Sequence, residues 1–140
     1  MSINLIFETK YWNIFLTEDQ MYLGRAVVDL KRNSPSLSSI TSEEFTDFHL
    51  VIKKYEHAVT EAFDATMFNW SCLMNNAYKL NPPKPHVHWH CRPRYNSSVE
   101  FYNEAFLDPN FGHHYDKDMQ HNVSQEIQEK IIQKIQQFIL

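Results

Sequence analysis

The stretch His86-Val87-His88-Trp89-His90 places three histidines at alternate positions of a short segment. Successive side chains of a β-strand point to opposite faces of its sheet. We therefore expect the three histidines on one face, and Val87 and Trp89 on the other. Imidazole is the side chain whose charge changes near neutral pH. The alternation predicts a strand with a core on one face and a chemical site on the other.

Taken alone, the alternating histidines are open to three interpretations. The first is a polar sheet face without chemistry. The second is a metal site, in which histidines about 6.5–7 Å apart on one strand share an ion with a further ligand. The third is nucleophilic catalysis by one imidazole, with its neighbours fixing its tautomer and orientation. Candidates for the further metal ligand are His113, His114, Asp116 and His121, although the segment 113–116 is more typical of a structural cap over the sheet.

Charge is distributed unevenly along the chain. The net charge of −4 argues against general nucleic-acid binding. The segment 65–99 contains no Asp or Glu but holds Lys79, Lys84, Arg92 and Arg94, a charge of +4 that leaves −8 for the rest of the chain. The histidines therefore lie in the electropositive tract of an acidic protein, and a phosphate is the kind of ligand that this tract favours. Arg94 is either a solvated residue at the strand end or a phosphate ligand.

Length and composition predict a single domain over residues 1–140, long enough to bury a core. No run of about 18 apolar residues is present, so we expect no membrane-spanning helix. The segment 1–10 lacks the basic start and apolar core of a secretory signal. Cys72 and Cys91 are too few for a disulfide scaffold and are expected to be reduced thiols. These features indicate a cytoplasmic protein.

Hydrophobic patterning predicts an α+β domain with a mostly antiparallel sheet. Thr41 and Glu44 fit a capping box at the start of a long helix. The apolar stripe of that helix comprises Phe45, Phe48, Ile52, Tyr55, Val59 and Ala62. Strands are expected at 11–16, 25–30, 67–74 and 86–92, the last closed by Pro93, with loops at 31–40 and 75–85, an irregular aromatic segment at 96–121 and an amphipathic helix at 124–140.

The sequence His86-Val87-His88-Trp89-His90-Cys91-Arg92 resembles the motif of the histidine-triad (HIT) family, in which three histidines alternate with apolar residues. Leu23-Gly24-Arg25-Ala26-Val27-Val28 looks like the Gly-His-apolar strand of the same family. The capped helix and the strand ending at Met74-Asn75 come in the family's order. The match covers about residues 11–95 and leaves 96–140 as a tail and C-terminal helix. Within the family the chain is similar to a prokaryotic branch, on Tyr22-Leu23-Gly24-Arg25, Phe68-Asn69-Trp70 and Asp108-Pro109-Asn110-Phe111-Gly112.

The resemblance implies a nucleotide-binding α+β fold that dimerises by joining two sheets. Members of the family hydrolyse or transfer nucleoside monophosphates through a nucleotidylated histidine. On this chain the resemblance implies His88 as the nucleophile, with His86 and His90 orienting and polarising it through hydrogen bonds.

The resemblance also implies which residues contact the nucleotide. Asn75 matches a polar position that contacts the phosphate. Phe15 and Thr17 fall where the family packs the base and holds the ribose. The family mechanism requires no metal, so we expect no metal and no other cofactor.

Two departures from the family pattern concern the substrate. Arg25 stands where many members have a histidine, and an arginine can still bind phosphate. The loop before the histidines is Asn81-Pro82-Pro83-Lys84-Pro85, in which Pro83 takes the place of a Ser or Thr and offers no side-chain donor. We expect Lys84 to contribute to leaving-group recognition instead. Arg92, which replaces the last apolar residue of the motif, is expected to contact the anionic substrate.

The sequence therefore predicts a hydrolase or nucleotidyltransferase that acts on phosphoanhydrides or phosphoramidates of nucleotides. Its expected partners are a small-molecule nucleotide and a second copy of the chain, with neither nucleic acid nor a membrane. The alternative is a non-catalytic nucleotide-binding protein in which the altered loop has lost leaving-group activation. A metal-binding protein is a weaker third interpretation.

Overall fold

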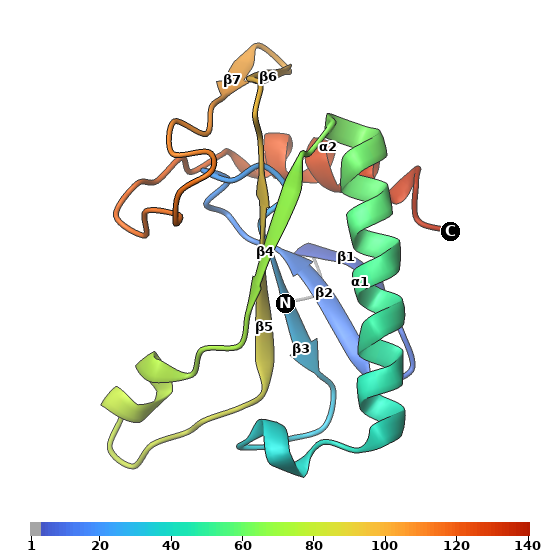
Figure 1. Cartoon of the computed structure of the whole chain (residues 1–140), viewed down its shortest axis with the longest axis vertical. Helices are drawn as coiled ribbons and strands as arrows, with labels where there is room; N and C mark the ends of the chain where they lie inside the picture. Colours follow the sequence, from blue (N-terminus) through green and yellow to red (C-terminus); the bar gives the residue numbers. More distant parts are fainter. Residues whose placement is uncertain (1–3) are drawn as a thin grey trace.

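The computed structural model describes residues 4–140. A five-stranded antiparallel sheet lies at its centre, in the order β1-β2-β3-β5-β4 (Figure 1). Helix α1 runs along one side of this sheet, whereas η3 and the segment between β7 and α2 lie on the other side (Figure 1). The elements are β1 (Leu5–Glu8), β2 (Trp12–Leu16), β3 (Ala26–Leu30), η2 (Leu37–Ser39), α1 (Ser42–Phe63), β4 (Met67–Ser71), η3 (Asn75–Lys79), β5 (His88–Arg94), β6 (Val99–Phe101), β7 (Glu104–Phe106) and α2 (Gln125–Gln136).

The predicted α+β architecture is confirmed, with a long helix, a C-terminal helix and an antiparallel sheet. The predictions for the segment 1–10 and for a domain over 1–140 extend to residues 1–3, which lie outside the described residues. Residues 5–8 form an edge strand that the sequence analysis did not predict. A four-residue strand carries too little periodicity to be recognised without its partner β2.

Helix α1 begins and packs as its sequence predicts. The capping box is present, because the Thr41 side chain accepts from the Glu44 amide and the Glu44 side chain accepts from the Thr41 amide. The buried face holds Phe48 and Tyr55, and Phe48 stacks on Trp89 of β5 with ring centroids 4.6 Å apart. Phe45 was expected on this face but is 49% exposed. Val51, which was not included in the predicted stripe, is fully buried.

The turn before β3 is held at a fixed place between the helix and the sheet. Gly24 has a φ of +90°, and a Cβ atom there would lie 3.2 Å from both Val59 and Pro93. The Tyr55 hydroxyl donates to the Gly24 carbonyl at 2.6 Å, and the Tyr95 hydroxyl donates to the Leu23 carbonyl at 2.7 Å. This close packing requires glycine and sets the position from which β3 begins.

Strand β5 begins and ends two residues later than the predicted strand 86–92. It begins at His88, so His86 precedes the strand, and it continues through Pro93 to Arg94. The pairing of β5 with β3 ends at Cys91, so the missing N–H of Pro93 removes no hydrogen bond to β3. Strand β4 pairs with β5 from Arg94 back to His90.

The bounds of several other elements also differ from the predicted ones. Strand β4 ends at Ser71 rather than Met74, and the predicted loop 75–85 begins with the 3-10 helix η3. The irregular segment 96–121 contains the β6–β7 hairpin. The amphipathic helix predicted at 124–140 is present as α2, which buries Ile127, Ile131 and Ile135 but ends at Gln136.

Candidate nucleotide-binding site

The candidate site lies on the sheet face opposite to α1. On β5, Trp89 and Cys91 belong to the core, and His88 and His90 point to the other face. The two imidazole rings contact edge to face, with centroids 4.9 Å apart and an interplanar angle of 77°. Register places Val27 of β3 opposite His90, and Phe15 of β2 opposite Val27. The histidine alternation was therefore interpreted correctly for His88 and His90, which share one face with an apolar row beside them.

His88 is held in a defined tautomer by the backbone. Its Nδ1 atom lies 2.7 Å from the carbonyl oxygen of His86. Because a carbonyl oxygen only accepts, Nδ1 carries the proton in this hydrogen bond. The lone pair of the neutral ring is then on Nε2, the atom that can attack an electrophile.

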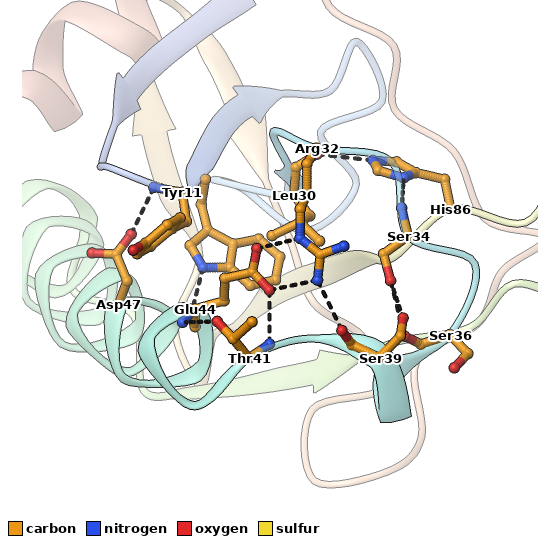
Figure 2. Close-up of polar contacts among 11 residues, drawn as sticks. Tyr11, Leu30, Arg32, Ser34, Ser36, Ser39, Thr41, Glu44, Asp47 and His86 are labelled. Carbon is orange, nitrogen blue, oxygen red and sulfur yellow. Dashed lines mark hydrogen bonds and ion pairs between the residues drawn. The ribbon is translucent and has the colours of Figure 1, made fainter.

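His86 has a different environment from the other two histidines. Its Nε2 donates to the Leu30 carbonyl at 2.9 Å, and its Nδ1 accepts from the Ser34 amide at 3.4 Å (Figure 2). Both ring nitrogens are thus engaged by the backbone that follows β3. His86 was expected to polarise His88 with its side chain, but its ring is bonded to this loop and the carbonyl of the residue contacts His88.

A polar chain connects this loop with the start of α1. Arg32 donates to both carboxylate oxygens of Glu44 at 2.6 and 2.8 Å, and it also donates to the Ser39 carbonyl at 2.8 Å (Figure 2). The hydrogen bonds of Arg32 and Thr41 lower the pKa of Glu44 from 4.5 to about 2. The capping residue of α1 therefore also anchors the segment that holds His86.

His90 lies in a more buried and more positive environment. Burial, with additional repulsion from His88, Arg92 and Arg25, lowers the pKa of His90 from 6.5 to about 4. The Nδ1 atom of His90 is buried and has no hydrogen-bond partner among residues 4–140. The low pKa keeps the His90 imidazole neutral near pH 7, with its Nδ1 unpaired within the described residues.

A cavity of about 560 Å³ opens beside His90. Its walls come from the turn before β3, from β5, from η3 and from the segment 115–120. The basic lining residues are Arg25, Lys79, Arg92 and Lys117, and the acidic ones are Asp19 and Asp116. Arg25 pairs with Asp19 at 2.9 Å, and the guanidinium of Arg92 lies 3.9 Å from the ring centroid of Tyr115.

Of the other residues predicted to bind the nucleotide, Asn75 lines this cavity, whereas Thr17 and Lys84 do not. Asn75 is exposed on η3 and lines the cavity together with His90 and Arg92. The Thr17 hydroxyl donates to the Asp19 carbonyl at 2.7 Å and accepts from Gln20, so it is already used within the protein. Lys84 is exposed in the loop before β5, and Lys79, which the sequence analysis did not select, is the lysine that lines the cavity from η3.

Arg94 has a structural role instead of the two roles considered for it. It is 1% exposed and forms an ion pair with Asp108 at 2.7 Å. Its five N–H groups donate to Asp108 twice, to Asn69, and to the carbonyls of Asn110 and His113. An arginine has five N–H donors, so none remains for a phosphate. Arg94 therefore fixes the segment 108–113 on the sheet.

The candidate metal ligands of the C-terminal segment do not form a cluster. Among residues 4–140, no group of three or more His, Cys, Asp or Glu side chains is arranged to hold a metal ion. His121 bonds Glu104 at 2.9 Å and stacks on Phe106, while the Nδ1 of His114 donates to the Tyr115 carbonyl. Tyr115 and Asp116 instead close the cavity beside His90. No local sequence signal identifies Tyr115 as a wall, because its contact with Arg92 depends on the long-range fold.

A family model decides the relationship to known proteins. The HIT domain model matches residues 2–97 of the chain. The chain belongs to the HIT domain family. The match includes the five strands of the central sheet, α1 and all three histidines, so the resemblance seen in the sequence is confirmed.

Solved histidine-triad structures share the fold of this HIT domain at low sequence identity. A hypothetical histidine triad nucleotide-binding protein from Sulfolobus tokodaii is 14% identical with a TM-score of 0.73, covering 97% of this chain and 83% of that chain. A histidine triad protein from Marinobacter aquaeolei is 15% identical with a TM-score of 0.72, covering 99% and 90%. The Plasmodium falciparum diadenosine triphosphate hydrolase is 16% identical with a TM-score of 0.67, covering 99% and 78%.

The comparison with curated proteins gave no significant match. No helix within residues 4–140 combines the length and apolar character that crossing a membrane requires.

Proposed function

We propose that this HIT domain is a nucleotide hydrolase or nucleotidyltransferase that cleaves phosphoanhydrides or phosphoramidates through a nucleotidylated His88. The observation that carries the proposal is the hydrogen bond from His88 Nδ1 to the His86 carbonyl. It leaves the Nε2 lone pair free on the exposed sheet face, as a nucleophile requires. The diadenosine triphosphate hydrolase among the similar structures supports the same class of reaction.

The reaction takes place in two displacements at the α-phosphorus. In the first, Nε2 of His88 bonds to the phosphorus while the bond from phosphorus to the oxygen or nitrogen of the leaving group breaks. The leaving group keeps the electron pair of that bond, and an amine takes up a proton as it departs. In the second, a water oxygen attacks the phosphorus, the bond to Nε2 breaks, and one water proton is released. The products are a nucleoside monophosphate and the free imidazole.

The surroundings of His88 suit a nucleotide. The apolar row of Phe15 and Val27 runs from His90 across β3 to β2 and offers a surface for the base. Asn75 and the basic residues of the cavity offer hydrogen bonds to phosphate oxygens. Thr17 and Lys84 stay predictions for the ribose and the leaving group.

The test is a hydrolysis screen over dinucleoside polyphosphates and nucleoside phosphoramidates. The wild-type protein is compared with His88→Ala and with the matched control His57→Ala, which alters an exposed histidine on α1 at the opposite face. We expect His88→Ala to abolish turnover and His57→Ala to leave it unchanged. Rapid quenching of an acid-labile adduct identifies the nucleophile, and an adduct on another residue would reject His88.

Two further results would favour the other interpretations. Tight nucleotide binding without turnover of any substrate in the screen would identify a non-catalytic binding protein, in which the loop with Pro83 fails to activate the leaving group. Activity lost to a chelator and restored by zinc would identify a metal-dependent protein. We expect chelator-treated protein to keep its activity.

A further inference from the structure

The segment 30–39, which we call the strap, encloses the two residues that precede β5. The Leu30 amide donates to the Val87 carbonyl at 3.3 Å, and the Val87 amide donates to the Ser34 carbonyl at 2.8 Å. The His86 ring adds its two bonds to the Leu30 carbonyl and the Ser34 amide. Leu30, Ser34 and Val87 are all buried. Four hydrogen bonds therefore fix the backbone of this residue pair against the strap.

The peptide group between His86 and Val87 connects the strap to the nucleophile. Its carbonyl accepts from Nδ1 of His88 at 2.7 Å, and its N–H donates to the Ser34 carbonyl. Hydrogen bonds at both ends of one peptide group polarise it and strengthen each other. When Nε2 of His88 bonds to phosphorus, the ring becomes an imidazolium, and its bond to this carbonyl becomes charge-assisted. The Ser34 carbonyl therefore acts on the reacting ring through a single peptide group.

Side chains hold Ser34 in this position. The hydroxyls of Ser34 and Ser39 bond to each other, and they lie 3.2 and 2.8 Å from the Ser36 carbonyl (Figure 2). The Ser39 carbonyl accepts from Arg32, whose guanidinium is held by both carboxylate oxygens of Glu44. Glu44 is 2% exposed and caps α1. A continuous chain of polar contacts thus runs from the first turn of the long helix to the nucleophile.

A second carboxylate of α1 offers a comparison, because it stabilises the helix along a different route. Asp47 lies one turn after the capping residue and is half-buried. It accepts from the Thr9 hydroxyl at 2.6 Å and from the Tyr11 amide at 3.0 Å (Figure 2). Within residues 4–140, the hydrogen bonds of this carboxylate therefore go to the turn between β1 and β2 and not to the strap.

We infer that Ser34, Arg32 and Glu44 are positioning residues for the nucleophile. They hold the peptide group after His86 so that its carbonyl keeps the proton of His88 on Nδ1 and stabilises the imidazolium of the nucleotidylated ring. The tautomer of a histidine is set by the hydrogen bond that its other nitrogen makes. A loosened strap should therefore reduce the fraction of His88 rings with a free Nε2 lone pair. This inference rests on the proposed function and extends it to residues that do not line the cavity.

The first experiment measures the tautomer of His88 from the nitrogen chemical shifts of its ring and needs no substrate. Ser34→Ala removes the hydroxyl contacts of the strap, and Glu44→Gln keeps the shape of its side chain but removes the charge that holds Arg32. We expect each variant to lower the ratio of the Nδ1–H to the Nε2–H tautomer about fivefold, as the loss of roughly one hydrogen bond would give. The control Asp47→Asn should leave this ratio unchanged.

The second experiment measures kcat and KM of the same variants with a dinucleoside polyphosphate. Ser34→Ala and Glu44→Gln should lower kcat about fivefold and leave KM within about twofold, because their side chains do not line the cavity. Formation of the acid-labile adduct should slow by the same factor. Arg32→Lys, which retains the charge, should keep more of kcat than Arg32→Gln. This pair replaces Glu44→Gln if that variant does not fold, since the Arg32 side chain is 46% exposed.

The two readouts separate this inference from the proposed function. Variants that are less stable but keep the wild-type tautomer ratio, or keep the wild-type kcat, would overturn the positioning role. An equal change of the tautomer ratio in Asp47→Asn would overturn it as well, because any loss of stability would then have the same effect. If the wild type turns over no substrate, the proposed function is rejected, and the tautomer ratio still decides whether the strap positions His88.

Discussion

The guanidinium of Arg94 and the carboxylate of Asp108 form a buried ion pair, with 2.7 Å between Nε and Oδ2 and 3.0 Å between the second pair of atoms. This pair joins the last residue of β5 to the segment that leads to Tyr115. The same carboxylate also accepts from the Tyr95 amide at 3.1 Å. The wall of the cavity beside His90 therefore depends on an ion pair whose two residues do not line the cavity.

Removal of Asp108 should strongly destabilise the fold. In Asp108→Ala, Arg94 remains buried without its counter-ion, which costs about 3–5 kcal/mol of the free energy of unfolding. Denaturant unfolding measures the loss. The control Asp118→Ala removes an exposed carboxylate of the same segment and should change stability by less than about 0.5 kcal/mol. Equal stability of Asp108→Ala and the wild type would contradict the structural role of the pair.

Glu44 should give the protein a contribution to stability that depends on acid pH. Because its pKa in the folded protein is lowered from 4.5 to about 2, its ion pair with Arg32 stabilises the fold fully above pH 4.5. The contribution is lost as the pH falls from 4.5 towards about 2. The difference in unfolding free energy between the wild type and Glu44→Gln should shrink across this range and stay constant above it. A difference that does not change with pH would count against the pair.

His90 should remain neutral well below neutral pH in the free protein. Its pKa is lowered from 6.5 to about 4, first by burial and then by His88, Arg92 and Arg25. An NMR titration of the imidazole should show this low pKa, which Arg92→Gln raises only in part because burial remains. Because the unfolded chain binds a proton at His90 more readily than the folded protein does, the free energy of unfolding should fall as the pH decreases from about 6.5 to about 4. Above pH 6.5 the neutral imidazole should make no pH-dependent contribution. A pKa for His90 that Arg92→Gln leaves unchanged would refute the contribution of Arg92.

His86 should matter more for stability than for the chemical step. In His86→Ala, the Leu30 carbonyl and the Ser34 amide lose their side-chain partner, which costs about 1–3 kcal/mol. The carbonyl of residue 86 remains, so the hydrogen bond to His88 can still form. We expect kcat of the folded variant to fall much less than for His88→Ala. A stable variant that has lost all turnover would instead assign a direct role to the His86 ring.

The oligomeric state is predicted from the edges of the sheet. Strands β1 and β4 are its two edges, and a free edge exposes unpaired backbone groups that a second copy can cover. Light scattering should give twice the mass of one chain. Met67→Glu, on edge strand β4, should shift the protein towards the monomer, while Leu107→Glu, exposed but outside the sheet, should not. A monomeric wild type at micromolar concentration would reject the prediction.

Local sequence patterns predicted the parts of the fold that depend on neighbouring residues. The capping box of Thr41 and Glu44 and the alternation of His88, Trp89 and His90 both follow from periodicity and short-range chemistry. Strand β1 was missed because four residues define a strand only through their partner. The start of β5 at His88 was missed because the His86 ring bonds to the loop after β3, and no pattern within 86–92 shows this.

The candidate site was predicted only in part for the same reason. The acid-free segment 65–99 contributes Lys79 and Arg92 to the lining of the cavity beside His90. Selecting Lys79 instead of Lys84 would have required knowledge of where η3 folds. The contact of Arg92 with Tyr115 depends on segment 108–116, which Arg94 holds against the sheet through Asp108, Asn110 and His113.

The turn at Leu23 and Gly24 fixes the backbone of one wall of the cavity, whereas the opposite wall is a surface segment. Two buried tyrosines from distant segments bond its two carbonyls, so the backbone beneath Arg25 cannot shift without disturbing both the helix and the sheet. Residues 117–120, by contrast, belong to a mostly exposed surface connection that tolerates exchange. Substitutions that reshape this cavity are therefore expected in the covering segment, and not in the turn beneath Arg25.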